Sequence, residues 1–550
     1  MTTYSVPVII VGGGLVGLSA ALFLNRQGIS YLLAERHSGT SIHPRSRGFN
    51  LRTMELYRNL DLEQAIREAG ASLSKSKGMF TAETLASAEL DLPQNGVPES
   101  TLRLMNPFVP NDDISPTRGN RCTQDVVEPL LLQAARDRGG DLRFSTELRS
   151  FRQDIDGVTA ELVDRATGTA STVRARYLIA ADGAKSPVRQ ALGISMTDEY
   201  SHGFLINIYF QADLRDVVQG REFSICNILH PEATGMLVAI NNSDRWCFHA
   251  PYDPQNESPE DYTPERCKDL LAKALGFPGL DIRILSVLPW EAAEGVAERF
   301  QAGRVFLAGD AAHVMPPTGG FGANTGVQDA HNLAWKLAAV LRGHAGPGLL
   351  ETYENERRPV ARFTAKQAGL IAANSMLSLF KGRTEGTLAN VLVNAMGYRY
   401  KSTAVLANDD SEAPQDQPEF HAAPGTRAPH VWVGHRSGRI STLDLFERSF
   451  VLVAGPDGAS WHAAAETARR RLGIGIDCYL LGPDGDLSDP DGLGQQAFRL
   501  SPGGAVLVRP DGFVAWRSDD GGTDDYGQTL VLALMQILSR ESGGHPAQDA

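Results

Sequence analysis

A glycine-rich turn near the amino terminus carries residue types suited to holding a dinucleotide. A β-branched run over residues 6–11 leads directly into this turn. Gly12 permits a tight bend, Gly14 lets backbone approach a pyrophosphate, and Gly17 lets the following helix pack against the strand. Glu35 follows the next predicted strand, where its carboxylate can accept hydrogen bonds from a ribose. The turn therefore predicts an adenine-dinucleotide site at the N-terminus of a helix.

Two later segments place acidic residues and glycines at the ends of further apolar runs. Asp182-Gly183 follows one run, and Gly309-Asp310 follows another. Asp310 can accept hydrogen bonds from the ribityl hydroxyls of a flavin, and the glycine-rich turn at 319–326 brings backbone N–H groups and a helix start toward its ring. A helix N-terminus stabilises the negative charge of a reduced flavin, whereas a nicotinamide has no use for it. These segments favour a flavin dinucleotide.

The motifs need parallel strands whose carboxyl ends meet at one edge of a sheet. Short apolar runs predict such strands at 6–11, 30–34, 177–181 and 304–308. Helical patterns over 18–27 and 327–341 follow the first and the last of these runs. We therefore expect an α/β protein that is built on a Rossmann-like domain.

The composition is that of an ordinary globular protein with room for several domains. The chain has 550 residues, of which 42% are hydrophobic and 21% are charged, and its formal net charge is -13. No Lys- or Arg-rich run is present, so we expect no nucleic-acid partner.

The cysteines and the amino-terminal sequence indicate the cellular compartment in which the protein is expected. The five cysteines are scattered and form no CxxC pair, which predicts a reducing compartment, no disulfide framework and no metal site. The apolar stretch at 6–24 contains four glycines and is preceded by no Lys or Arg, which argues against a signal peptide or a membrane span. We expect a cytoplasmic protein with no membrane partner.

In their order and separation, the three motifs resemble those of the single-component flavoprotein aromatic hydroxylases, the family of para-hydroxybenzoate hydroxylase. The resemblance implies FAD as cofactor and NADPH or NADH as reductant, with the segment around Asp182-Gly183 serving both. Arg45 and Arg47 match a basic loop that faces the pyrophosphate and the flavin in that family, although two surface arginines would give the same pattern.

The resemblance also implies individual cofactor contacts. Gln124 matches a glutamine that meets the ribityl chain, and Leu148 matches a backbone contact to adenine. Ala323 stands where related sequences often carry Met. The expected cofactor-binding residues are Gly12, Gly14, Leu15, Val16, Gly17, Glu35, Arg36, Arg45, Gln124, Leu148, Asp182, Gly183, Gly309, Asp310, Pro317, Gly322, Ala323 and Asn324.

Between the second and third motifs, alternating apolar and polar residues predict a sheet with one inward face. The expected strands are 204–211, 222–228, 235–240 and 245–249. The family places its substrate-binding sheet here, over the flavin. The candidate substrate residues are Asn207, Tyr209, Met236, Phe248 and His249, although ordinary sheet packing explains each equally well. No catalytic base is identified from the sequence.

The expected organisation is a Rossmann-like FAD-binding domain, an interleaved β-sheet substrate domain and a C-terminal thioredoxin-like domain. Their expected ranges are 1–74, 104–190 and 287–408 for the first, 75–103 and 191–286 for the second, and 419–550 for the third. A largely helical segment over 380–408 and a polar linker over 409–418 precede the third domain.

The third domain is expected to have no redox role. Its strand-like runs and the hairpin signal at 505–516 resemble the C-terminal domain of phenol hydroxylase and of the polyketide hydroxylases. A redox domain needs paired thiols, whereas Cys478 stands alone. Structural support or a dimer contact is therefore expected, with a homodimer among the expected assemblies.

Further residues extend the resemblance over nearly the whole chain, to bacterial aromatic-polyketide hydroxylases of the tetracenomycin and anthracycline kind. They are the segments 43–45, 50–55, 317–322 and 329–336. The resemblance implies an FAD- and O2-dependent monooxygenase that hydroxylates a polycyclic phenol or quinone through a flavin C4a-hydroperoxide. Three alternatives stay open: Baeyer-Villiger oxidation of a polyketide ketone, hydroxylation of a monocyclic phenol, and flavin binding without catalysis.

Overall fold

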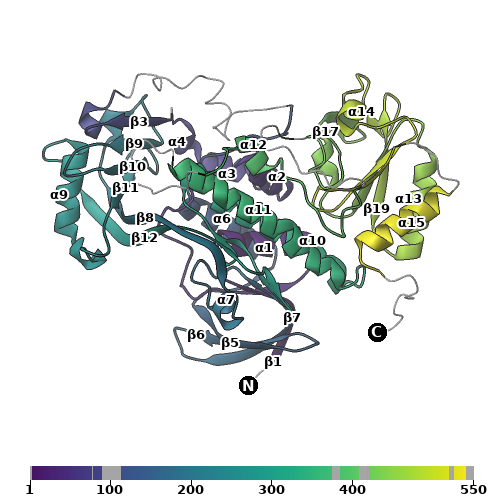
Figure 1. Cartoon of the computed structure of the whole chain (residues 1–550), viewed down its shortest axis with the longest axis horizontal. Coiled ribbons are helices and arrows are strands. Elements are labelled where there is room, and N and C mark those ends of the chain that lie inside the picture. The colour runs from purple at the N-terminus through teal and green to yellow at the C-terminus, as the bar shows by residue number, and fades with distance from the viewer. Residues whose placement is uncertain are drawn as a thin grey trace.

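The computed structural model describes residues 3–76, 78–89, 113–373, 385–407, 418, 420–519 and 525–540. In this part of the chain the strands form three sheets, and two long helices cross the middle of the molecule (Figure 1). The first sheet lies at the bottom of Figure 1, the second at the left and the third at the right. The predicted α/β class is confirmed. No helix in the described residues is both long and apolar enough to cross a membrane.

The first sheet aligns the ends of five parallel strands. In sheet order these are β14 (Val305–Leu307), β7 (Ala170–Ala180), β1 (Thr3–Val11), β2 (Tyr31–Ala34) and β4 (Asp141–Arg143). Their last residues pair in one row, running from Leu307 through Ala180, Val11 and Ala34 to Arg143. The chain leaves all five strands at the same edge, where parallel sheets form their binding sites. The antiparallel strands are β13 (Gln301–Ala302), β5 (Thr146–Gln153) and β6 (Val158–Asp164).

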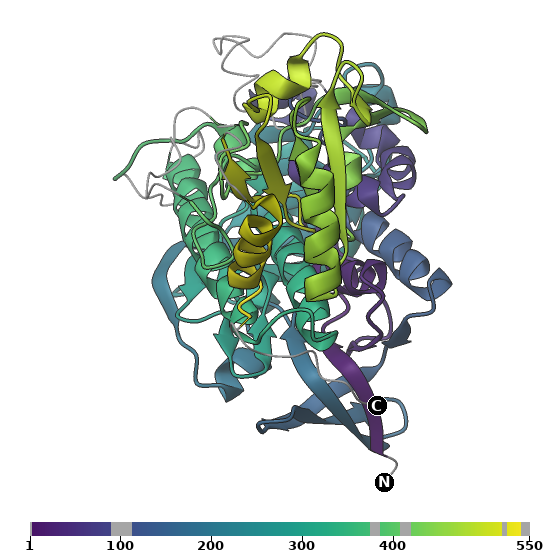
Figure 2. The same ribbon diagram turned by 90° about the vertical axis from the view of Figure 1, so that its right-hand side faces the viewer.

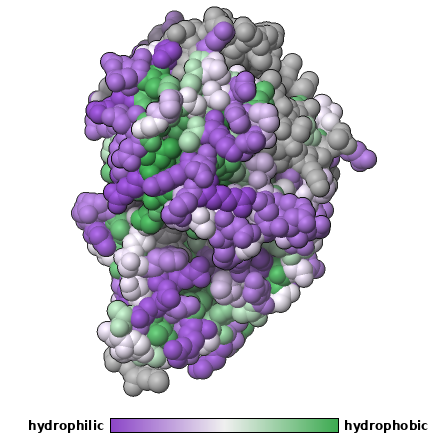
Figure 3. All heavy atoms as spheres, turned by 90° about the vertical axis from the view of Figure 1, so that its left-hand side faces the viewer, coloured by the Kyte–Doolittle hydropathy of each residue, from purple (hydrophilic) through white to green (hydrophobic). Residues whose placement is uncertain are grey.

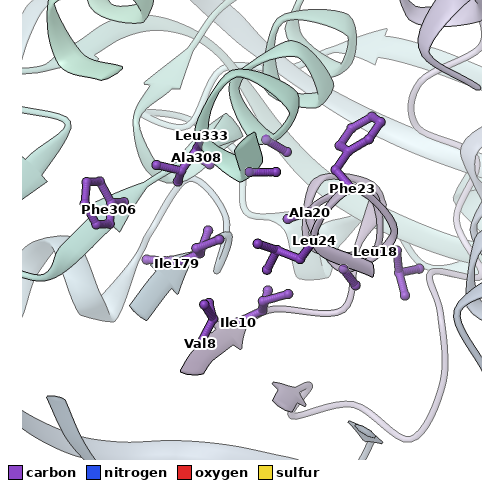
Figure 4. Packing of buried hydrophobic residues seen from close by; sticks show 14 of the residues in the cluster. Val8, Ile10, Leu18, Ala20, Phe23, Leu24, Ile179, Phe306, Ala308 and Leu333 are labelled. Carbon is purple, nitrogen blue, oxygen red and sulfur yellow. The ribbon is translucent and has the colours of Figure 1, made fainter. Parts of the chain in front are cut away.

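Apolar side chains of two helices form a core with this sheet. Helices α1 (Leu15–Arg26) and α10 (Gly322–Leu341) contribute to one buried cluster with β1, β7 and β14. Figure 4 shows Leu24 of α1 close to Ile10 of β1, and Leu333 of α10 beside Ala308. The β-branched residues of the strands fill the space between the layers, as expected for a sheet with helices packed on it.

Glycines let α1 approach its neighbours more closely than any side chain would allow. Gly12 has a φ of +106°, and a Cβ added at Gly17 would lie 1.9 Å from the Gly12 carbonyl oxygen. On the α10 side, Cβ atoms added at Gly309 and Gly326 would lie 2.7 and 2.6 Å from Cγ2 of Val16. The predicted reasons for Gly12 and Gly17 are therefore confirmed.

One face of the second sheet packs in an apolar core, and the opposite face, the polar face, carries Asn207 and His249 together with a small buried cluster around Tyr209. Its order is β15 (His313–Val314), β12 (Arg283–Ala297), β8 (Met196–Gln211), β11 (Arg245–Pro251), β10 (Gly235–Ala239), β9 (Ile225–Ile228) and β3 (Met79–Ala82). On one face, Ile206, Ile208 and Phe210 are buried in a core with α9 (Pro264–Leu275). Asn207 and Tyr209 lie on the opposite face, since neighbouring residues of a strand alternate. Figure 3 views the α9 end of the molecule, where apolar residues gather in a band between hydrophilic ones.

The third sheet forms a separate layer with its own helices. Its order is β17 (Gly438–Ser441), β16 (Trp432–His435), β20 (Leu487–Ser488), β19 (Ile476–Gly482), β18 (Phe450–Ala454), β21 (Ala505–Val508) and β22 (Val514–Ser518). The helices are α13 (Ser460–Leu472), α14 (Leu493–Phe498) and α15 (Tyr526–Ile537). Figure 2 shows this layer in front of α10 and the first sheet. Trp335 of α10 joins the core between β18, α13 and α15.

A buried charge cluster joins the third sheet to the two long helices. On α11 (Gly348–Ala373), Glu356 accepts a hydrogen bond of 2.7 Å from Lys336 of α10 and bonds of 2.6 and 3.0 Å from Arg509. Arg509 also donates to Asp511, and Asn332 donates to Glu356. All five side chains are at most 1% exposed. Burial of so many charges requires each to be paired, so the third layer is held in one position.

The predicted helix over 380–408 is wrong in most of its described part. Only α12 (Val391–Ala395) is helical between residues 385 and 407. After Gly397 the chain forms no regular element, and Tyr398 and Tyr400 point inward, where they meet the buried Arg357 at 3.3 and 3.0 Å and stack with Phe513. The predicted linker at 409–418 lies outside the described residues, except for 418.

Loss of the Glu356 carboxylate should destabilise the protein strongly. Glu356→Ala leaves Lys336 and Arg509 buried without their partner, and we expect the free energy of unfolding to fall by about 3–5 kcal/mol. Equilibrium urea unfolding measures this change. The control is Asn355→Ala, at an exposed position on the same helix, for which a change within about 0.5 kcal/mol is expected. Equal stability of the two variants would show that the charge cluster does not hold the layers together.

Candidate active site

The residues of all three sequence motifs meet at the aligned edge of the first sheet. Gly12 follows β1, Glu35 follows β2, Asp182 lies just beyond β7, and Asp310 lies just beyond β14. Because the ends of these strands are in register, segments far apart in sequence share this edge. The edge therefore collects a glycine turn, three carboxylates and the start of α1 in one place.

The N-terminus of α1 faces two carboxylates. Glu35 accepts hydrogen bonds from the backbone N–H groups of Gly13 at 2.6 Å and His37 at 2.8 Å. Glu128 of α6 (Gln124–Asp137) accepts from the backbone of Leu15 at 2.8 Å. Leu15 is the first residue of α1, so Glu128 satisfies an N–H group that the helix leaves without an internal partner. The glycine turn is therefore held rigidly in its open shape.

Glu128 is a residue that the sequence reasoning missed. Its Oε2 accepts from the backbone N–H of Ser41 at 2.9 Å, and Gln124 donates at 2.6 Å to Oε1, the oxygen that also accepts from Leu15. Burial raises the pKa of Glu128 above its ordinary value. No local signal marks this residue, since its partner Leu15 lies 113 positions away. Gln124, a predicted cofactor residue, thus lies beside the glycine turn.

The second and third motifs are tied to each other. Asp182 accepts from the hydroxyl of Ser186 at 2.5 Å and from the backbone of Val188 at 3.0 Å, which orders the start of α7 (Pro187–Ala191). Arg189 donates to the carbonyl oxygens of Ala184 and Ala311, both at 2.9 Å. The turn after β7 and the turn after β14 therefore form one unit.

A fully buried carboxylate on α10 holds the turn after β14. Asp329 accepts from the backbone N–H of Gly309 at 3.1 Å and lies 2.7 Å from His313 Nε2. Its other oxygen accepts from Arg357 Nε at 2.7 Å. Asp310, the neighbour of Gly309, is solvent-exposed, although the surrounding protein raises its pKa and the charge of Arg45 opposes this rise. The turn is thus fixed from behind while its carboxylate stays accessible.

The loop over residues 43–50 connects the start of α10 to the second sheet. Asn324 donates to the carbonyl of Gly48 at 3.2 Å and accepts from the backbone N–H of Asn50 at 2.9 Å. On the other side, the ring of His43 lies edge-on to Tyr209 with 5.8 Å between centroids. This loop therefore lies between the strand edge and the polar face of the second sheet.

The remaining predicted cofactor residues lie around the same edge or near it. Leu148 lies in β5, whose first residue donates its N–H to the Glu35 carbonyl at 2.8 Å. Arg36 is exposed, and its carbonyl accepts from Arg165 at 3.1 Å. The residues at the third motif are Pro317, which is exposed, and Gly322 and Ala323 in the first turn of α10.

This donor set fits FAD. At Gly14 an added Cβ would have one neighbour within 4 Å, Glu128 Oε1 at 3.4 Å, so the turn is open to a pyrophosphate. The exposed Asp310 carboxylate can accept from hydroxyl groups, and α1 and α10 both begin near it, because Val16 contacts Gly309 and Gly326. Two helix N-termini and an acceptor match a dinucleotide with a polyhydroxyl chain.

Four of the five candidate substrate residues share the polar face of the second sheet. His249 Nδ1 forms a hydrogen bond with Asn207 Oδ1, and His249 pairs with Met236 across the sheet. Tyr209 accepts a hydrogen bond of 3.2 Å from Arg245. The prediction of Phe248 as a pocket residue is wrong. Its side chain alternates to the other face and is fully buried in the core with α9.

Burial keeps the two histidines of this face neutral. Burial, helped by the charge of Arg45, lowers the pKa of His43 to about 4. Burial, with Arg47 and His43 adding to it, lowers the pKa of His249 to about 3. His43 is 5% exposed, and its Nδ1 lies 3.0 Å from the hydroxyl of Ser286 on β12. Near neutral pH both rings can accept or donate hydrogen bonds without carrying charge.

The two arginines of the loop diverge. The charge of Arg45 acts on Glu128 and Asp310 at the strand edge. Arg47 reaches the second sheet, where it donates to the hydroxyl of Ser224. The sequence reasoning placed both arginines against the pyrophosphate and the flavin. The structure brings only Arg45 to that edge.

Comparison with known proteins agrees with this geometry. A model described as FAD binding domain matches residues 5–368, and one described as Aromatic-ring hydroxylase, C-terminal, matches residues 421–540. The chain is 45% identical to the tetracenomycin A2 monooxygenase-dioxygenase of Streptomyces glaucescens, covering 99% of this chain and 98% of that protein. It is 40% identical to the 4-methyl-5-nitrocatechol 5-monooxygenase of a Burkholderia species, covering 97% and 98%.

A solved structure is similar over the same extent. The crystal structure of a ternary complex of aklavinone-11 hydroxylase with FAD and aklavinone superposes with a TM-score of 0.85 at 37% identity. The match covers 98% of this chain and 100% of that one. The similarity therefore includes all three sheets.

Removal of the Asp310 carboxylate should weaken flavin retention. Asp310→Ala removes the exposed acceptor at the end of β14 without touching the buried support from Asp329. We expect the purified variant to lose most of its visible flavin absorbance per protein. Asp216→Ala, at an exposed position after β8, serves as control and should stay as yellow as the unaltered protein. A fully yellow Asp310→Ala would remove this residue from the site.

Replacement of Cys478 should leave activity intact. Burial raises the pKa of this thiol to about 12, so near neutral pH it is not the reactive thiolate. It pairs across the sheet with Leu452, not with another cysteine. Cys478→Ser is expected to oxidise NADPH or NADH at the unaltered rate. A tenfold loss in a variant of unchanged thermal stability would assign the third layer a redox role.

Proposed function

Because the chain belongs to the family of FAD-binding aromatic-ring hydroxylases, we propose that it hydroxylates a polycyclic aromatic phenol or quinone, using NADPH or NADH and O2. The observation that carries this proposal is the loop over residues 43–50. It touches the start of α10 through Asn324 and the polar face of the second sheet through His43. A cofactor at the strand edge and an aromatic ring on that face would then share one space.

Bound FAD, reduced by a nicotinamide, supplies the activation of O2 and the transfer of one oxygen atom. In the proposal, the turn at 12–17 and the N-terminus of α1 hold the pyrophosphate. Glu35 accepts from the adenosine ribose, and Asp310 accepts from the ribityl chain. The start of α10, at Gly322 and Ala323, stabilises negative charge on the flavin ring. The chain thus supplies binding, orientation and electrostatic support.

The polar face of the second sheet orients the substrate. Asn207 and His249 hold one another by a hydrogen bond, and Tyr209 is held by Arg245, so their polar atoms keep fixed positions. The apolar core behind Phe248 supports this face and limits its movement. Fixed donors and acceptors allow a ring to be held in one orientation while oxygen is transferred.

We infer the size of the substrate from the names of similar proteins. The names of two similar proteins refer to polycyclic compounds, tetracenomycin A2 and aklavinone, and we extend this class to the present chain. A second candidate is a monocyclic phenol, which one relative at 40% identity favours through its name, 4-methyl-5-nitrocatechol 5-monooxygenase. Both candidates use the same flavin chemistry and differ in the size of the ring system that must fit against the second sheet.

The deciding experiment combines cofactor oxidation with isotope labelling. The FAD-loaded protein is mixed with NADPH or NADH, labelled O2 and a panel containing hydroxylated anthraquinones and 4-methyl-5-nitrocatechol. We expect a polycyclic phenol to stimulate nicotinamide oxidation and to gain one labelled oxygen on an intact ring. Stimulation only by the nitrocatechol would favour the second candidate, and a lactone product would indicate Baeyer-Villiger oxidation. A yellow protein that turns over no aromatic compound would overturn the proposal.

A further inference from the structure

Arg47 is a cation without an acidic partner beside the proposed substrate face. Its guanidinium donates to the Ser224 hydroxyl at 2.5 Å, and its Nε is buried without any hydrogen-bond partner. Across the described residues, no carboxylate forms an ion pair with it. The charged or titratable groups that act on it are Arg121 and Cys247. Burial raises the pKa of the Cys247 thiol to about 12, so this group is neutral near pH 7.

The charge of Arg47 also acts on His249, which is neutral near pH 7 for the reason given above. Asn207, the hydrogen-bond partner of His249, carries no charge. His43, on the same loop as Arg47, is neutral as well. The Nε2 atom of His43 is buried and, like Arg47 Nε, has no hydrogen-bond partner. Two polar atoms of one loop are therefore left unsatisfied on the same face of the sheet. Folded proteins satisfy nearly all buried polar groups, and isolated buried cations are costly.

Burial also changes the acidity of Arg47. Burial, aided by the positive charge of Arg121, lowers the pKa of Arg47 to about 10. A guanidinium placed for structural reasons is normally compensated, as the buried Arg509 is by Glu356 and Asp511. Unlike Arg509, Arg47 has no carboxylate partner among the described residues, and an anionic ligand would supply the missing negative charge.

A surface hollow lies at the β12 edge of this sheet and reaches the His43 side of the cluster. This hollow of about 600 Å³ runs along the first part of β12 and the start of α9. Ser286 lines this hollow and also contacts His43 Nδ1 at 3.0 Å. Leu285, another lining residue, packs against the cluster that contains Tyr209 and Cys247. The volume is within the range of small-molecule sites.

We propose that Arg47 recognises an ionised oxygen of the substrate, a phenolate, enolate or carboxylate, while the neutral His43 and His249 lie beside it as hydrogen-bonding groups. The inference rests on the proposed function and narrows it to substrates that carry an acidic oxygen. Arg45 serves the cofactor edge and Arg47 serves the substrate face, so one loop supplies both charges. A guanidinium holds a planar oxyanion group more firmly than an ammonium does.

Three flat ring systems of similar size test this assignment on the FAD-loaded full chain. They are 1,2-dihydroxyanthraquinone, which ionises to a phenolate of different colour, anthraquinone-2-carboxylate, and uncharged 9,10-anthraquinone. Dissociation constants are measured for the unaltered protein, Arg47→Gln, Arg47→Lys and the control Arg215→Gln, which replaces an exposed arginine that follows β8. Visible spectra of bound dihydroxyanthraquinone report whether it is ionised.

We expect Arg47→Gln to bind at least one charged probe about 10- to 100-fold more weakly, with anthraquinone changed less than about twofold. Bound dihydroxyanthraquinone should lose its ionised spectrum in this variant, and Arg47→Lys should restore part of the affinity. Weaker binding of dihydroxyanthraquinone alone would indicate that Arg47 recognises a phenolate, and weaker binding of anthraquinone-2-carboxylate alone would indicate a carboxylate.

Equal weakening of all three probes would overturn the assignment by showing a structural role, as would unaltered binding by Arg47→Gln. Failure of the unaltered protein to prefer either charged probe over anthraquinone would also overturn it. Failure of this inference can be distinguished from failure of the proposed function. Arg47-dependent binding without labelled product would contradict only the hydroxylase, whereas hydroxylation that does not depend on Arg47 would contradict only this inference.

Discussion

The close approach of α1 to its neighbours is the constraint on which the cofactor edge depends. Gly17 lies against the carbonyl of Gly12, and Val16 lies against Gly309 and Gly326, at distances that leave no room for a Cβ. These contacts join the turn after β1, the turn after β14 and the first part of α10. Movement of any one would require the others to move, because packed interiors have few voids. The positions of the three motifs relative to one another are set by these missing side chains.

Buried charges then hold the rest of the molecule around that edge. Asp329 supports the turn at Gly309, and farther along the same helix Lys336 reaches the cluster of Glu356 and Arg509. The segment 329–336, which supported the family resemblance in the sequence, therefore acts as internal scaffolding. Paired buried charges contribute little net stability but strongly disfavour arrangements that separate them. The first half of α10 thus supports the turn after β14, and its second half holds the third sheet in place.

The cofactor edge could be predicted from the sequence because it depends on local signals. A buried strand followed by glycine or an acid was found at Gly12, Asp182 and Asp310, and parallel strands bring such ends together. The support of this edge by Glu128 was not predictable, since it depends on a contact across 113 positions. The direction of Arg47 and the wrong face assigned to Phe248 have a similar origin. Sheet register and loop path decide them, and neither is a local property.

The alternation of the second sheet also bears on how such proteins diversify. Every second residue of β8, β10 and β11 faces the proposed substrate, whereas its neighbours, among them Ile208 and Phe248, are locked in a core. Mutations at the less buried positions of this face can therefore change recognition while the core behind Phe248 is preserved, whereas Tyr209, Val238 and Cys247 on the same face are themselves buried. Proteins named for tetracenomycin A2 and for 4-methyl-5-nitrocatechol are 45% and 40% identical to this chain over nearly its full length. New specificity in this architecture can therefore evolve through the residues on one face of the sheet, while the residues on the other face preserve the fold.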